Sequence, residues 1–311
     1  MKFFDAEATR AALPFDKLID SIRDMFAKGC EVPLRHNHAI PGRTDEKNSV
    51  LIMPAWNQGE YLGIKTVTIF PNNANHSLPG LFSTYILYSA VTGEPLAYLD
   101  GNEITSRRTA AASALAASLI APVRAKRQLI VGAGRVGSVV PDAYLAVLPI
   151  EEFLIWDTNK DNAHKLVNRL KDEGLDASIV DDLAQAAQQS DIITCATLAQ
   201  TPYIDGLWLK PGTHLDLIGS FAPHMHEAKS NCFAGDVRLF VDTDEALMKS
   251  GDLLTPMGEG VFSRKDVAGT LADLVAQKGD VDRPPQQRTV FKAVGTALED
   301  LATAVLVLSN T

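Results

Sequence analysis

Cysteine is scarce in this chain of 311 residues, which contains only Cys30, Cys195 and Cys232. An odd number of cysteines at wide spacing predicts neither a disulfide framework nor a Cys-x-x-Cys site. Cys195 lies in an apolar run, and free cysteines in such runs usually behave as small buried hydrophobic side chains. We therefore expect no cysteine-based cross-links.

Long apolar runs and clusters of positive charge are missing as well. Ala110–Leu119 is too short and too rich in alanine to span a bilayer, and Asp5 precedes any apolar run that would make a signal peptide. The net charge is −9, with lysine and arginine scattered, whereas a nucleic-acid surface needs clustered cations. We expect a cytoplasmic protein that binds neither membrane nor nucleic acid. A small anionic substrate stays open, because it needs only two or three local cations.

The histidines do not have the spacing of a metal site. His36 and His38, like His224 and His226, are two residues apart, whereas a helical zinc site of the zincin type has its two histidines four residues apart. No cysteine lies near either pair, and no Gly-x-Ser-x-Gly motif of acyl-transfer enzymes occurs. We therefore predict that the protein has no metal site.

The length of the chain favours two domains. Apolar residues at helical spacing predict an amphipathic helix over Phe15–Phe26, and an alanine-rich helix is expected over Glu103–Ala121, before Pro122. Between them lie strand-like runs separated by turn signals, at Ser49–Met53, Tyr61–Phe70, Phe82–Ser89 and Pro95–Leu99. The first domain is therefore predicted to be an α+β domain with an antiparallel sheet.

From Gln128 onward, short apolar strands alternate with helices, which indicates a parallel, doubly wound α/β sheet of the Rossmann type. Strands are expected at Gln128–Val131, Glu152–Trp156, Ala177–Val180, Ile192–Ala196, His214–Ile218 and Arg238–Val241, with helices from Arg135 and over Asn162–Glu173. Beyond Pro284-Pro285, the pattern of Val290–Leu308 predicts one long helix that returns to the first domain. The expected domains are 1–121 with 288–311 for substrate binding and dimerisation, and 122–287 for dinucleotide binding.

A glycine fingerprint, Gly132-Ala133-Gly134-Arg135-Val136-Gly137, follows the first of these strands directly. In this context Gly132 permits the tight turn, Gly134 lets the backbone approach a pyrophosphate, and Gly137 allows close packing of helix on strand. The N–H groups at the start of the next helix are then available to phosphates. Pro141 falls inside that helix and is expected to kink it.

Asp157 directly follows the next strand, at the place of the carboxylate that binds the adenosine ribose. Since a carboxylate there repels a 2′-phosphate, we expect NAD(P)H as cofactor with NADH favoured, although Lys160 would soften that preference. The alternative is a structural glycine turn followed by a solvated aspartate.

Several cations lie where a packed domain does not need them. Lys65 lies between apolar neighbours on a predicted strand, and Arg107 and Arg108 lie at the start of an apolar helix, where the helix dipole disfavours cations. Arg35 is a further candidate. A bound carboxylate or phosphate would offset the cost of these positions. The alternative for Lys65 is a lysine on the solvent face whose stem covers apolar surface.

Along nearly its whole length the chain resembles the ornithine cyclodeaminase/mu-crystallin family. The matching stretches include Pro33-Leu34-Arg35, Ile52-Met53-Pro54, Gly63-Ile64-Lys65, Asp100-Gly101-Asn102-Glu103-Ile104-Thr105, Arg108-Thr109-Ala110-Ala111, Gly132-Ala133-Gly134, Pro211-Gly212-Thr213-His214-Leu215, Thr289-Val290-Phe291-Lys292, Val294-Gly295 and Glu299-Asp300. The resemblance implies a dimer with a barrel-like sheet interface. It also implies that Arg35, Lys65 and Arg108 surround the substrate carboxylate beside the nicotinamide. The residues implied along the cofactor, besides the glycine fingerprint and Asp157, are Thr197, Gly219, Val294 and Gly295.

Two departures from the cyclodeaminase pattern favour the ketimine reductase branch of this family. Phe221 and Leu51 stand where cyclodeaminases carry an aspartate and a glutamate. The resemblance then implies NAD(P)H-dependent reduction of Δ1-pyrroline-2-carboxylate, and of Δ1-piperideine-2-carboxylate, to L-proline and L-pipecolate in hydroxyproline breakdown. Arg35 and Arg108 would clamp the carboxylate and Lys65 would supply the proton. The alternatives are ornithine cyclodeamination, an amination of 2-oxo acids like that of alanine dehydrogenase, and a non-catalytic binding protein like mu-crystallin.

Overall fold

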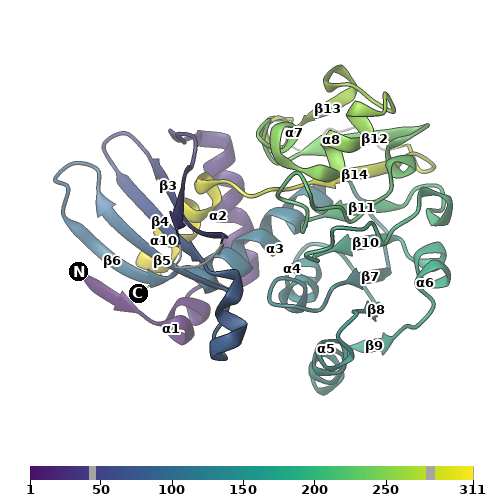
Figure 1. Cartoon of the computed structure of the whole chain (residues 1–311), viewed down its shortest axis with the longest axis horizontal. Coiled ribbons are helices and arrows are strands. Elements are labelled where there is room, and N and C mark those ends of the chain that lie inside the picture. Colours follow the sequence, from purple (N-terminus) through teal and green to yellow (C-terminus); the bar gives the residue numbers. More distant parts are fainter. Residues whose placement is uncertain (42–46, 278–283, 311) are drawn as a thin grey trace. The chain divides into compact units, whose positions relative to one another are not determined.

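A computed structural model describes residues 1–41, 47–277 and 284–310, and the chain divides into two compact units. The first unit comprises Met1–Arg108 and Thr296–Thr311, and the second comprises Thr109–Gly295. The colour ramp of Figure 1 shows the yellow C-terminal helix α10 (Ala297–Ser309) within the first unit. The second unit begins inside helix α3 (Gly101–Ile120) rather than at residue 122, so the division at 121 and 288 stays a prediction.

The first unit contains a six-stranded sheet in the order β1-β6-β5-β4-β3-β2, antiparallel except for β1 and β6, which run parallel. Its strands are β1 (Lys2–Phe4), β2 (His36–Pro41), β3 (Lys47–Trp56), β4 (Tyr61–Ile69), β5 (Leu81–Ser89) and β6 (Pro95–Asp100). Its helices are α1 (Ala6–Ala11), α2 (Phe15–Lys28), α10 and the 3-10 helix η1 (Pro71–His76). The structure confirms the helix and the four strands predicted here and adds β1 and β2. Both were missed because β1 is short and β2 is mostly polar.

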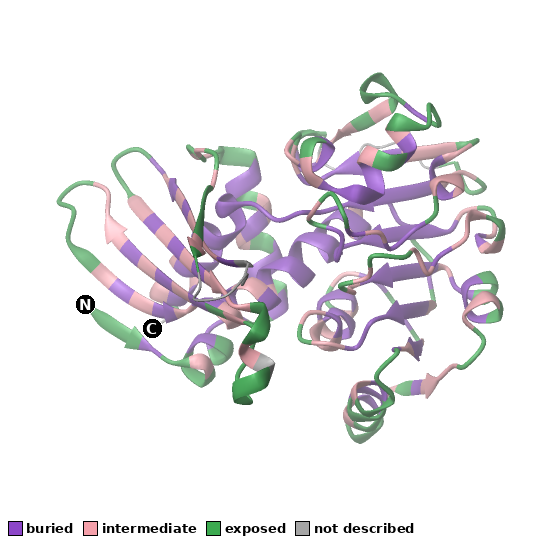
Figure 2. Ribbon diagram, viewed as in Figure 1, coloured by how far each residue is buried: buried purple, intermediate pink, exposed green. Residues whose placement is uncertain are grey.

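Helix α10 packs against α2 and against β3, β4 and β5, so one face of this sheet is covered. Buried residues alternate with half-buried ones along β4 and β5, as expected for a sheet covered on one side. Figure 2 shows this alternation as purple and pink bands. Gly63, Lys65 and Val67 of β4 point to the covered face.

The second unit is a parallel eight-stranded sheet in the order β13-β12-β14-β11-β10-β7-β8-β9. Its strands are β7 (Arg127–Val131), β8 (Glu152–Trp156), β9 (Asp176–Ile179), β10 (Ile192–Cys195), β11 (His214–Leu217), β12 (Val237–Val241), β13 (Val267–Thr270) and β14 (Arg288–Lys292). Its helices are α4 (Val140–Leu145), α5 (Lys160–Asp172), α6 (Leu183–Gln189), α7 (Ala246–Lys249), α8 (Gly251–Gly258) and α9 (Leu271–Ala276). Short 3-10 turns lie at η2 (Gly137–Val139), η3 (Gly206–Trp208), η4 (Ser230–Phe233) and η5 (Arg264–Asp266). The doubly wound Rossmann-type fold and its six predicted strands are confirmed.

The single helix predicted over Val290–Leu308 is wrong in its first part. Strand β14 takes up Arg288–Lys292 and lies between β11 and β12, inside the sheet of the second unit (Figure 1). Helix α10 begins only after Thr296, whose side chain accepts a hydrogen bond from Leu298 N–H. A parallel strand buried on both faces has a continuous apolar sequence, which cannot be told from a buried helix by its periodicity.

The kink expected at Pro141 is also absent. The helix after the glycine loop begins at Val140, so Pro141 lies in the first turn of α4, where its missing N–H costs no helical hydrogen bond.

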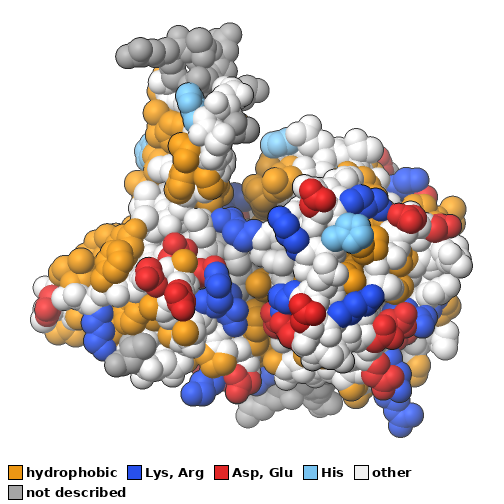
Figure 3. Space-filling model, turned by 90° about the horizontal axis from the view of Figure 1, so that it is seen from below, with side chains coloured by type: hydrophobic (Ala, Val, Ile, Leu, Met, Phe, Trp, Pro, Cys, Tyr) orange, Lys and Arg blue, Asp and Glu red, His pale blue; other side chains and the backbone are white. Residues whose placement is uncertain are grey.

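No helix among the described residues is long and apolar enough to cross a membrane. On the face drawn in Figure 3, the Lys and Arg side chains of the second unit are interspersed with Asp and Glu.

Candidate active site

The residues predicted to bind the cofactor lie at the carboxyl ends of the strands in the second unit. Gly132 follows β7, Asp157 follows β8, Thr197 comes shortly after β10, Gly219 after β11 and Val294 after β14. The strands are parallel, so these ends share one edge of the sheet. Strands β7 and β10 are neighbours although β8 and β9 separate them in sequence. Such a reversal of strand order is where open α/β sheets bind their ligands.

The glycine loop after β7 has two glycines that the packing requires and one that is open. Gly132 has φ +95°, and a Cβ there would lie 2.7 Å from the carbonyl oxygen of Ala196. A Cβ on Gly137 would lie 1.8 Å from the carbonyl oxygen of Gly132. A Cβ on Gly134 would meet no heavy atom within 4 Å. The open side at Gly134 fits the approach of a pyrophosphate to the backbone.

Asp157 is buried rather than solvated, with 9% of its surface exposed. Its Oδ2 accepts a 2.7 Å hydrogen bond from Ala133 N–H, and its Oδ1 accepts one of the same length from Asn159 N–H. Each carboxylate oxygen has a second lone pair, so Asp157 can still accept bonds from ribose hydroxyls. Lys160, which we expected to soften the preference for NADH, forms an ion pair with Asp181 (Nζ to Oδ1, 2.7 Å).

Asp242, at the end of β12, holds the segment that follows β14. Its Oδ2 accepts hydrogen bonds from Val294 N–H at 2.7 Å and from Gly295 N–H at 2.6 Å. Burial raises the pKa of Asp242 and outweighs the lowering effect of these backbone donors. No sequence pattern singles out Asp242, because its role depends on the segment after strand β14 being its neighbour.

In the first unit, Lys65 and Arg108 meet two acids of α10. Lys65 Nζ lies 2.6 Å from Asp300 Oδ2, and Arg108 binds Asp300 Oδ1 through Nε at 3.0 Å. Arg108 Nη1 donates to Glu299 Oε2 at 2.7 Å. All four side chains are buried. We call Lys65, Arg108, Glu299 and Asp300 the cation–acid cluster. The alternative of Lys65 on a solvent face does not hold, because only 2% of this residue is exposed.

The charges in and around the cluster favour the binding of an anion. Burial lowers the pKa of Lys65 to about 8; Asp300 opposes this shift, whereas Arg108 and Arg35 add to it. Burial acts to raise the pKa of Asp300, but Lys65 and Arg108 lower it below its ordinary value. The two positive charges of the cluster cancel its two negative charges. Arg35 is close enough to Lys65 to add one more positive charge. A substrate with one carboxylate fits this balance.

Glu299 and Asp300 entered the sequence analysis only as a matching stretch, not as site residues. The signal that could have found them is their place in α10, whose sequence Ala297–Ser309 contains no other charged residue. Adjacent acids in an otherwise apolar helix require buried partners of opposite charge.

The other candidate residues do not belong to the cation–acid cluster. His36 and His38 lie side by side on β2 with ring centroids 6.2 Å apart, and the described residues contain no group of three or more histidines, cysteines or acids able to hold a metal ion. Phe221 follows β11 and is 48% exposed, and Leu51 is half-buried on β3.

Comparisons with known proteins identify the family of this chain. A model of the ornithine cyclodeaminase/mu-crystallin family matches residues 6–311. Delta(1)-pyrroline-2-carboxylate reductase of Colwellia psychrerythraea is 35% identical, over 98% of this chain and 96% of its own. The structure of Thermococcus litoralis Delta(1)-pyrroline-2-carboxylate reductase with NADH and L-proline has a TM-score of 0.92 and 30% identity, covering 100% of this chain and 97% of its own. An archaeal alanine dehydrogenase dimer with bound NAD has a TM-score of 0.91 and 26% identity, covering 100% and 95%. The chain belongs to the ornithine cyclodeaminase/mu-crystallin family, and its reductase relatives place it among the NAD(P)H-dependent oxidoreductases.

Proposed function

We propose that this protein reduces the cyclic ketimine Δ1-pyrroline-2-carboxylate to L-proline, and Δ1-piperideine-2-carboxylate to L-pipecolate, with NADH, as a step in hydroxyproline breakdown. The observation that carries the proposal is the buried Lys65–Asp300 pair with Arg108 beside it. These residues supply a positive charge that can bind an anion and an ammonium group that can donate a proton. The reductases of Colwellia psychrerythraea and Thermococcus litoralis support the choice of substrate.

Arg108 and Arg35 are assigned to the substrate carboxylate. Glu299 and Asp300 fix the plane of the Arg108 guanidinium through Nη1 and Nε. A guanidinium has five N–H donors, so Arg108 can keep both acids and still donate to a bound carboxylate. Fixing the carboxylate orients the ring, and orientation is a large part of what an enzyme contributes to such a reaction.

Lys65 is assigned to the imine nitrogen. Reduction of C=N adds a hydride to C2 and a proton to nitrogen, and a protonated imine is the better hydride acceptor. When bound, NADH supplies that hydride. With a pKa of about 8, the Lys65 ammonium holds its proton at neutral pH and releases it more readily than an ordinary lysine does.

The preference for NADH over NADPH rests on Asp157. The bonds from Ala133 and Asn159 hold its carboxylate beside the glycine loop. A 2′-phosphate at the ribose would meet this buried negative charge, whereas ribose hydroxyls can donate to it.

A homodimer is proposed from the face of the six-stranded sheet opposite α10. Directly paired residues make an apolar row across five strands: Phe3 with Tyr98, Tyr98 with Ile86, Ile86 with Ile64, and Ile64 with Pro54. All five are half-buried or exposed, and Phe3 is 70% exposed. Contiguous apolar rows that reach solvent often mark interfaces, and an alanine dehydrogenase of similar fold is a dimer.

One assay distinguishes the proposal from its alternatives. Purified protein with NADH and Δ1-pyrroline-2-carboxylate is expected to consume NADH and form proline in equal amounts. Release of ammonia from ornithine without consumption of NADH would instead indicate a cyclodeaminase. NADH consumption that requires pyruvate and ammonia would indicate an alanine dehydrogenase. Binding of NADH with no turnover of any of these substrates would indicate a binding protein.

A further inference from the structure

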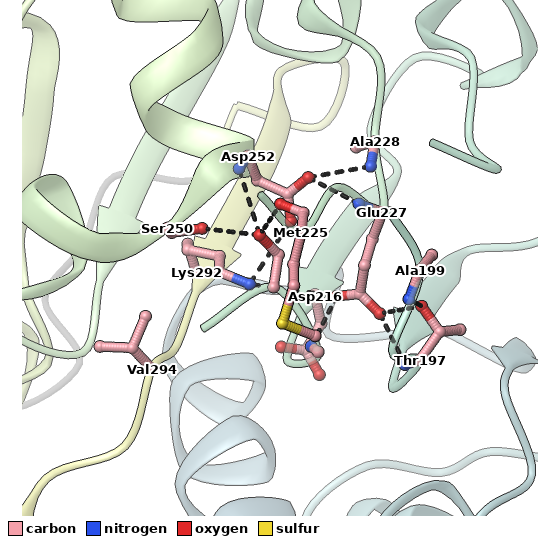
Figure 4. A network of polar contacts seen from close by, with 12 residues as sticks. Thr197, Ala199, Asp216, Met225, Glu227, Ala228, Ser250, Asp252, Lys292 and Val294 are labelled. Atoms are coloured by element: carbon pink, nitrogen blue, oxygen red, sulfur yellow. Dashed lines mark hydrogen bonds and ion pairs between the residues drawn. The ribbon is translucent and has the colours of Figure 1, made fainter. Parts of the chain in front are cut away.

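Three charged side chains are buried together near the ends of β10, β11 and β14 in the second unit (Figure 4). Lys292 and Asp252 are fully buried and Glu227 is 1% exposed. Lys292 Nζ lies 3.4 Å from Asp252 Oδ2 and 4.0 Å from Glu227 Oε2. Burying charges is costly unless they are paired and hydrogen-bonded, so this arrangement calls for a reason beyond packing.

Glu227 joins the two loops that follow β10 and β11. Its Oε1 accepts hydrogen bonds from Thr197 N–H at 2.7 Å and from Thr197 Oγ1 at 2.8 Å. Its Oε2 accepts one from Gly219 N–H at 2.6 Å. The loops also touch directly, because a Cβ on Gly219 would lie 1.9 Å from the carbonyl oxygen of Thr197. Glu227 is thus the shared acceptor for two residues that the family resemblance implies along the cofactor.

The contacts of Glu227 suit an ionised carboxylate. Both backbone partners are N–H groups, which only donate, and a carboxylate only accepts. Lys292 provides the opposite charge. Asp252 Oδ1 in turn accepts from the N–H groups of Glu227 and Ala228, at 2.7 and 3.1 Å, and so fixes the backbone that carries Glu227 (Figure 4).

We propose that Glu227 is a positioning residue for the nicotinamide cofactor, whose ionised carboxylate holds the loops of Thr197 and Gly219 in their binding conformation. This inference rests on the proposed function, because it assumes that the cofactor lies along these two loops. Glu227 itself acts through Thr197 and Gly219 and need not touch the cofactor.

Cofactor binding should then depend on pH. Burial raises the pKa of Glu227 to about 7; Lys292 lowers it, and Asp252 raises it further. Cys195 on β10 is a further titratable neighbour whose pKa burial raises, and Asp216 on β11 interacts electrostatically with Cys195. Above pH 7 the carboxylate is ionised and the loops are held. As the pH falls through 7, Glu227 gains a proton, one hydrogen bond to a loop is lost, and NADH should bind more weakly.

The test is the dissociation constant of NADH, measured by fluorescence between pH 6 and pH 8.5 for the wild type and Glu227→Gln. The glutamine amide turns a donor toward Thr197 N–H or Gly219 N–H, so we expect binding weaker by about tenfold at pH 8. We also expect the weakening at low pH to disappear. Asp182→Asn, which changes an exposed helix cap in the same unit, is the control and should bind NADH like the wild type.

A Glu227→Gln protein that is folded and keeps the wild-type affinity, or the wild-type pH dependence, overturns the inference. Should this variant fail to fold, Thr197→Val removes the hydroxyl bond that lowers the pKa of Glu227, so the midpoint of the pH dependence should move to higher pH; an unmoved midpoint would refute the inference. A wild-type protein that does not bind NADH at all contradicts the proposed function instead.

Discussion

The ammonium of Lys65 lies 2.6 Å from the carboxylate of Asp300, and both side chains are almost completely withdrawn from solvent. The two residues come from a strand and a helix that are more than two hundred positions apart in sequence. Burial lowers the pKa of Lys65, and the pairing with Asp300 acts against that shift.

The rate of imine reduction should fall as the pH rises through about 8, the pKa of Lys65. Burial stabilises the neutral amine, so Lys65 loses its proton at a lower pH than an ordinary lysine does and then has none to donate. The measurement is the pH profile of kcat/KM for the imine at saturating NADH. Lys65→Met should reduce kcat by about 100-fold or more while leaving NADH affinity unchanged. Wild-type turnover by Lys65→Met would remove this residue from the mechanism.

Replacing Asp300 with asparagine should move that alkaline limb to lower pH. Without the carboxylate, nothing opposes the effects of burial, Arg108 and Arg35 on Lys65. Breaking a buried ion pair should also lower the free energy of unfolding by about 3 kcal/mol, measured by denaturant titration. The control is Glu103→Gln, which removes the 2.6 Å ion pair with Arg10, whose side chain is 59% exposed. Its effect should stay below about 1 kcal/mol. Equal effects in both variants would contradict the role given to burial.

Arg108→Lys should raise KM for the imine by about tenfold or more and leave KM for NADH unchanged. Lysine keeps the charge but loses the planar fork that binds Glu299, Asp300 and a carboxylate together. The matched control is the adjacent Arg107→Lys, because Arg107 lies over the Phe15 ring and donates to the Leu13 carbonyl. A similar rise in KM for both variants would show that Arg108 has no specific role.

The sequence predicted the helices and strands more reliably than it predicted which charged side chains would pair. Strands with clear turn signals, such as β4 and β8, were found within one residue of their ends. Strand β14 was mistaken for helix because it lies between β11 and β12 inside the sheet and is almost completely buried, a fact of topology that no local pattern contains.

In the candidate site too, local patterns predict some residues and miss others. Lys65 and Arg108 were noticed because cations interrupt apolar patterns, and Gly132 and Asp157 because their spacing is typical of dinucleotide sites. Glu227 and Asp242 were missed, because each gains its role from strands and loops that are distant in sequence.

Asp157→Ser should weaken NADH binding by about tenfold and narrow the difference between NADH and NADPH. Serine loses the charge that repels a 2′-phosphate, and its single oxygen replaces the two that accept separately from Ala133 N–H and Asn159 N–H. Dissociation constants for both cofactors provide the measurement. Asp172→Ser, which changes an exposed acid at the end of α5, should leave the ratio of the two constants unchanged. An unchanged ratio in Asp157→Ser would show that this residue does not select the cofactor.

Ile64→Lys should convert the proposed dimer into monomers, because it places a charge in the middle of the apolar row formed by Phe3, Tyr98, Ile86 and Pro54. Ile64 is half-buried on the face opposite α10, so the lysine can reach solvent in a monomer but is trapped in an interface. Light scattering coupled to size exclusion gives the mass directly. Val123→Lys changes a residue of the second unit that is 65% exposed and should leave the mass as it is. If Ile64→Lys remains folded and dimeric, the interface lies on another surface.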